Sequence, residues 1–118
     1  MKLQEAVELI RNNLEGAEIE VIRHIIGQDS EYFKLKVQLN NIILIVRERW
    51  AGGKLHLYGY QLLMNNEDIL RYDNVPHHPG INTFPHHKHI RGHIEGLKNA
   101  SLKAFLDEVK SFLPLFTS

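Results

Sequence analysis

The chain has no cysteine, no long apolar run and no net charge. Without cysteine it can form neither a disulfide framework nor a thiolate metal site. Its longest purely apolar run, residues 42–46, is far too short to span a bilayer. The charged N-terminus lacks the apolar centre of a signal peptide, and a protein dedicated to duplex DNA is usually more basic. We therefore expect a cytoplasmic protein without a membrane segment, and 118 residues predict a single domain, residues 1–118.

The spacing of the apolar residues predicts an α+β fold. Residues 2–14 have helical periodicity, with Leu3, Val7 and Ile10 on one face. Strand patterns separated by turn residues follow at 17–27, 32–39, 42–50, 54–64 and 69–73. Residues 102–113 are again helical, and Pro114 is expected to end that helix. This order predicts an N-terminal helix, an antiparallel meander sheet of four to five strands and a C-terminal helix.

Histidine is concentrated in one segment of the chain. Six of the eight histidines lie within residues 71–93, which read RYDNVPHHPGINTFPHHKHIRGH. Pro76, Pro79 and Pro85 oppose regular strand pairing, so we expect a His-rich loop over residues 74–100. A structureless run of this length is uncommon inside a compact domain and is often functional.

This segment resembles the signature of a known family. Residues 71–79, RYDNVPHHP, and residues 83–89, TFPHHKH, are similar to the pattern of the TumE-like family, the toxin halves of small bacterial and archaeal toxin–antitoxin modules. The preceding LYGYQLL, the chain length and the element order also fit, so the resemblance covers most of the chain. Val75 departs from the pattern, where a small residue such as alanine is more usual, and His93 lies outside it.

The resemblance implies a cytoplasmic protein that inhibits growth by attack on RNA. It also implies a cognate antitoxin, usually encoded beside the toxin and often carrying a helix-turn-helix.

The segment holds the residue types that metal-independent RNA cleavage needs. That reaction requires a base for the 2′-hydroxyl proton, an acid for the leaving 5′-oxygen and cations for the phosphate charge. Histidine suits both proton transfers near neutral pH, and a carboxylate can orient an imidazole. We predict an endoribonuclease without a cofactor whose catalytic residues are His77, His78, His86, His87, His89 and Asp73. The residues expected to bind substrate are Arg71, Tyr72, Asn74 and Lys88.

A metal site is the main alternative reading of the same residues. His87 and His89 are two residues apart, so in an extended chain they point to the same side. With Asp73 they could hold Zn²⁺ or Mn²⁺, which would make the protein a metal-dependent phosphoesterase or nuclease. A third reading is a non-enzymatic binding protein whose histidines are structural. The sequence also leaves open whether the protein forms a homodimer.

Overall fold

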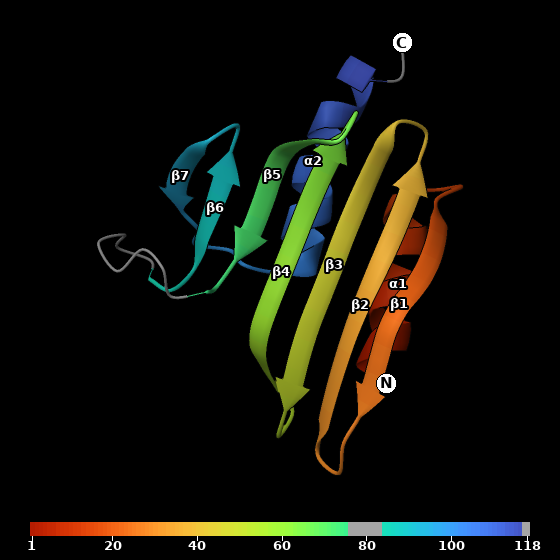
Figure 1. Ribbon diagram of the computed structural model, residues 1–118, viewed down its shortest axis with the longest axis vertical. Helices are drawn as coiled ribbons and strands as arrows, with labels where there is room; N and C mark the ends of the chain where they lie inside the picture. The colour runs from red at the N-terminus through yellow and green to blue at the C-terminus, as the bar shows by residue number, and fades with distance from the viewer. Residues whose placement is uncertain (76–83, 117–118) are drawn as a thin grey trace.

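Two helices lie on the same face of one antiparallel sheet (Figure 1). The computed structural model describes residues 1–75 and 84–116, with side chains up to residue 113. Within these ranges the elements are α1 (Lys2–Asn13), β1 (Glu18–Ile26), β2 (Ser30–Leu39), β3 (Ile42–Ala51), β4 (Lys54–Met64), β5 (Glu67–Asp73), β6 (His87–Ile90), β7 (His93–Gly96) and α2 (Leu102–Phe116). The seven described strands follow one another across the sheet in chain order. The predicted α+β meander between two helices is therefore confirmed.

Two-residue turns join most neighbouring strands. Their residues with positive φ are Asn40, Gly52, Gly53, Asn65, Asn66, Arg91 and Gly92. Glycine adopts this left-handed backbone without a steric penalty, and asparagine tolerates it better than most residues. A turn of this length fixes the register of the strands that flank it. The meander is thus specified largely by its own turns.

The segment predicted to be one long loop contains two strands, β6 and β7, so that prediction was wrong and the sheet has more strands than the four to five expected. The three prolines of the segment all precede β6. Each new strand has only four residues, too few to show a periodic pattern, and β6 forms by pairing with β5.

Helix α2 also differs from expectation, since it continues through Pro114 to Phe116. Proline removes only one backbone donor from a helix.

The core lies between the helices and the sheet face that they cover. Alternate residues of the central strands enter it, and side chains from both helices meet them. Its largest fully buried members include Ile10, Leu14, Phe33, Leu35, Leu44, Tyr58, Tyr60, Leu62, Phe105 and Leu106. Each such apolar side chain contributes roughly 1.5–3 kcal/mol. The other sheet face has no helix over it in the described part of the chain (Figure 1), and we call it the open face.

A carboxylate of β2 anchors the start of α1. The backbone N–H groups of Lys2 and Leu3 donate to Glu31 at 2.8 and 3.2 Å, and Nε2 of His24 lies 2.8 Å from the same carboxylate. Burial raises the pKa of Glu31, but these hydrogen bonds outweigh it and lower the pKa below its ordinary value. Glu31 therefore acts as a helix cap supplied from a distant part of the chain.

A second carboxylate is buried between the sheet and the helices. Glu48 is 6% exposed and accepts hydrogen bonds from the Tyr60 hydroxyl and from Nε1 of Trp50. Burial raises its pKa, and the two hydrogen bonds oppose that rise only in part. The core thus holds an acid whose charged form is disfavoured.

Candidate functional site

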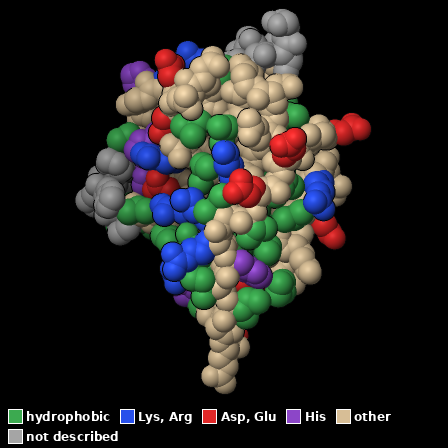
Figure 2. Space-filling model, turned by 45° about the vertical axis from the view of Figure 1, so that its right-hand side comes forward, with side chains coloured by type: hydrophobic (Ala, Val, Ile, Leu, Met, Phe, Trp, Pro, Cys, Tyr) green, Lys and Arg blue, Asp and Glu red, His purple; other side chains and the backbone are tan. Residues whose placement is uncertain are grey.

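A cavity of about 320 Å³ opens on the open face of the sheet. Its charged and titratable lining residues are Lys34, Arg47, Arg71, Asp73, His87 and His89. Asp73 is the one carboxylate among the described lining residues. Figure 2 shows Lys and Arg side chains gathered on this side of the molecule, beside histidine and a few acidic side chains. The pocket therefore suits an anionic ligand.

Strand register assembles the pocket from residues far apart in sequence. Lys34 pairs with Arg47, Arg47 with Gly59, Gly59 with Asp73, and Asp73 with His87. Directly paired residues of neighbouring strands lie side by side on one face. A Cβ at Gly59 would lie 2.7 Å from Nε of Arg47, so the absent side chain is what gives Arg47 room. One row across the strands thus carries, in order, two cations, a glycine without a side chain, a carboxylate and an imidazole.

Asp73 and His87 form the centre of the pocket. Nε2 of His87 lies 2.8 Å from Oδ1 of Asp73, and its Nδ1 lies 2.9 Å from the carbonyl oxygen of Pro85. His87 is 3% exposed and Asp73 is 7% exposed. Both ring nitrogens of His87 therefore have partners within the protein, and the residue is well placed to hold Asp73 in position.

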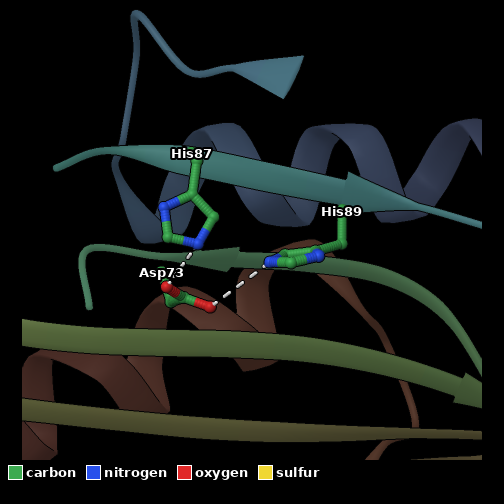
Figure 3. Close-up of side chains that lie close together, drawn as sticks. All are labelled: Asp73, His87 and His89. Carbon is green, nitrogen blue, oxygen red and sulfur yellow. Dashed lines mark ion pairs between the residues drawn. The ribbon is translucent and has the colours of Figure 1, made fainter. Parts of the chain in front are cut away.

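His89 is the more accessible imidazole of the pair. Its Nε2 lies 4.0 Å from Oδ2 of Asp73, and its side chain is 18% exposed. Figure 3 shows His87 and His89 reaching from β6 to the same carboxylate. Nε of Arg71 lies 3.4 Å from Oδ2 of Asp73, and the Arg71 side chain is 39% exposed. An anion entering the pocket would meet His89 and Arg71 together.

These residues also have the composition of a metal site. One ligand atom from each of Asp73, His87 and His89 lies within 4.8 Å of the others. A metal-bound histidine usually donates its second ring N–H to a carbonyl or carboxylate, and Nδ1 of His87 faces the Pro85 carbonyl in this way. Two histidines and one carboxylate on adjacent strands could therefore hold a divalent ion.

His86 lies apart from the pocket lining. Its Nδ1 is 2.9 Å from the Tyr58 hydroxyl, and the two rings are stacked with centroids 5.8 Å apart. Tyr58 belongs to the buried core. Burial raises the pKa of Tyr58 well above its ordinary value, with a smaller contribution from Asp73. The hydroxyl therefore stays protonated and can donate a hydrogen bond to Nδ1 of His86.

Three residues predicted to bind substrate are engaged in the fold instead. The buried Tyr72 donates from its hydroxyl to Glu108 of α2, and Nζ of Lys88 lies 3.4 Å from the same carboxylate. Asn74 accepts from the backbone N–H of Tyr58 and donates to the His56 carbonyl. Successive residues of a strand point to opposite faces, so Tyr72 and Lys88 lie on the helix-covered face while their sequence neighbours line the pocket.

Sequence reasoning missed the cations that β2 and β3 contribute to the pocket. Lys34 and Arg47 are 39 and 26 residues before Asp73, and only the sheet register brings them to it. The available signal was the alternation of residues 32–39, which placed Lys34 and Lys36 on one polar face. The predicted His77 and His78 lie outside the described residues.

Comparison with known proteins identifies a family match over most of the chain. Residues 6–113 match the family model described as Toxin TumE. No match was found among curated proteins or solved structures. The matched range includes all the described pocket residues. Neither described helix has the length and apolarity needed to cross a membrane.

Proposed function

Because the chain belongs to the TumE toxin family, we propose that it is an endoribonuclease of the cytoplasm that cleaves RNA in the pocket of the open face without a metal ion. The observation that carries the proposal is the contact of Asp73 with both His87 and His89 inside a pocket lined by Lys34, Arg47 and Arg71. Proton-transfer groups and phosphate-binding cations therefore occupy one cavity.

The proposed reaction is attack of a ribose 2′-hydroxyl on the adjacent phosphorus. The bond between the 2′-oxygen and phosphorus forms, and the bond between phosphorus and the 5′-oxygen breaks. A base removes the proton of the 2′-hydroxyl, and an acid gives a proton to the leaving 5′-oxygen. His89 is the described imidazole with access to substrate, so it exchanges one of these protons. Arg71 and Arg47 stabilise the phosphate charge. His87 positions Asp73, and the sequence offers His77 and His78 for the other proton transfer.

The second candidate is a metal-dependent nuclease with Asp73, His87 and His89 as ligands to Zn²⁺ or Mn²⁺. The clustering of their ligand atoms favours it. The surrounding charge disfavours it, because a divalent ion would enter beside the cations of Lys34, Arg47 and Arg71. We therefore prefer the metal-independent nuclease to the metal-dependent one.

Cleavage of a labelled RNA by the purified chain, with and without EDTA, tests the proposal. We expect cleavage to persist in EDTA and to fall by about 10²-fold or more in His89→Ala. His56→Ala is the matched control, since His56 is an exposed histidine of the β3–β4 hairpin whose ring lies 3.1 Å from the backbone carbonyl of Ala51, outside the pocket lining. Loss of cleavage in EDTA would favour the metal site. Absence of cleavage under all conditions would reject the nuclease and favour a binding protein.

Membership of a toxin family implies a cognate antitoxin. That this antitoxin carries a helix-turn-helix, and that the toxin forms a homodimer, stay predictions. Co-purification of the two proteins, followed by mass measurement of the complex, would test both the partner and its stoichiometry.

A further inference from the structure

A row of cations leads from the pocket across the open face to the edge of the sheet. Arg23 of β1 pairs with Lys34 of β2, and Lys34 pairs with Arg47 of β3. The same row continues through Gly59 to Asp73. Neighbouring strands are about 4.8 Å apart, so the row from β1 to β5 spans roughly 19 Å. We call Arg23, Lys34 and Arg47 the cation row.

The cation row has no acidic partners among the described residues, since no ion pair joins any of the three to a carboxylate there. Two cations outside the row do have such partners: Lys88 pairs with Glu108, and Lys103 pairs with Asp107. Like charges directly opposite each other destabilise a sheet. A row of three adjacent cations on strands therefore indicates an external anion.

An aromatic side chain lies beside the cation row on the same face. Tyr32 is two residues before Lys34 in β2, so both point to one side of the sheet. The Arg49 guanidinium lies 5.0 Å from the centre of the Tyr32 ring, and Tyr32 is only half-buried. A partly accessible aromatic ring on a sheet next to cations is a platform on which an unpaired base can stack.

We propose that the cation row binds the sugar–phosphate backbone of single-stranded RNA and leads it to the pocket, while Tyr32 stacks on a base. Flat sheet faces with aromatic and basic residues recognise single strands, because unpaired bases can be splayed onto them. This inference rests on the proposed function, since it places the RNA of that reaction. To the pocket cations Lys34 and Arg47 it adds Arg23 and Tyr32 as residues that position the strand.

Salt-dependent binding tests the cation row separately from cleavage. The probe is a fluorescent single-stranded RNA, bound by His89→Ala protein so that it stays intact, and the assay is anisotropy at 50 and 200 mM salt. Each phosphate contact to a single strand accounts for about 2.6-fold of affinity lost over this range. Three contacts give about 18-fold, and we expect about 7-fold after Arg23→Gln, Lys34→Gln or Arg47→Gln.

Two control variants test whether the salt dependence comes from the cation row itself. Arg11→Gln removes an exposed arginine of α1, which lies on the other side of the sheet, and should leave the salt dependence unchanged (Figure 1). Tyr32→Leu should weaken binding about 5-fold or more at both salt concentrations without changing that dependence. Thermal melting of each variant checks that the fold is retained.

The outcomes distinguish this inference from the nuclease proposal. RNA cleavage by the wild type together with unchanged binding in all three row variants would overturn the cation row alone. Salt-dependent binding through the row without any cleavage would support it and count against the nuclease. If the row variants released the cognate antitoxin but kept full RNA affinity, the surface would be a protein-docking site and the inference would be wrong.

Discussion

His87 and His89 should separate stability from activity, although they are only two residues apart. His87→Ala removes a 3%-exposed ring and leaves Asp73 without its 2.8 Å partner. His89→Ala removes a more exposed ring whose Nε2 lies 4.0 Å from Oδ2 of Asp73. We therefore expect His87→Ala to destabilise the fold and His89→Ala to remove activity from a stable protein.

The magnitudes follow from burial and hydrogen bonding. Loss of a hydrogen-bond partner from a buried polar side chain costs up to about 3 kcal/mol, and an exposed or loose ion pair contributes under about 1 kcal/mol. For 118 residues, the entropy of unfolding converts 1 kcal/mol into a Tm change of about 4 °C. We expect Tm to fall by up to about 12 °C in His87→Ala and by at most about 4 °C in His89→Ala.

Circular dichroism melting of both variants, beside wild type and His56→Ala, provides the measurement. Growth inhibition on induced expression, assayed with the same variants, gives the activity. A His87→Ala protein that melts like wild type would refute the reasoning, because the Asp73–His87 contact would then contribute nothing to holding β6 on β5. Full toxicity of a folded His89→Ala protein would remove His89 from the mechanism.

Two further predictions concern the buried carboxylates. Glu31→Ala should lower the free energy of unfolding by roughly 2 kcal/mol at neutral pH, because α1 loses its cap and His24 loses its partner. Since the pKa of Glu31 is lowered in the fold, this difference should be present above its ordinary pKa of 4.5 and shrink as pH falls through the lowered value; a pH-independent difference in urea melts would contradict it. Glu48→Gln should behave oppositely: burial raises the pKa of Glu48, so its contribution to wild-type stability is present below 4.5 and lost as pH rises through the raised value. The variant should gain stability relative to wild type as pH rises, and urea melts at about pH 4 and pH 7 that show no such gain would count against a buried, disfavoured charge.

The structure brings together some of the candidate residues that the sequence named and separates others. Asp73, His87 and His89 were named as members of one His-rich segment, and the pairing of β5 with β6 places them side by side. Tyr72 and Lys88 came from the same stretch, but strand alternation directs them to the other face and to Glu108. For Tyr72 the predicted strand 69–73 already implied this separation. For Lys88 it required knowing that residues 87–90 form a strand, which four residues after a proline-rich segment do not reveal.

The cations of the pocket could not be assigned from sequence for a different reason. Lys34 and Arg47 lie in well-predicted strands, yet their distance from Asp73 depends on three successive registers across β2 to β5. A shift of one residue in any register would turn a side chain to the opposite face. The two-residue turns set these registers at the hairpin ends, but the pairing shifts between Arg49 and Trp50 and between Leu62 and Leu63. The pattern of one strand does not reveal such irregularities.

The meander order has a consequence for synthesis of the chain on the ribosome. Each strand pairs with the one made just before it, so β1 to β5 can align in the order in which they emerge. The histidines that contact Asp73 come from β6, and the core residues Phe105 and Leu106 come from α2, the last helix. A nascent or truncated chain that ends before β6 therefore carries the cation row without the two histidines that contact Asp73. The Asp73–His87–His89 cluster forms only after the first five strands have been made.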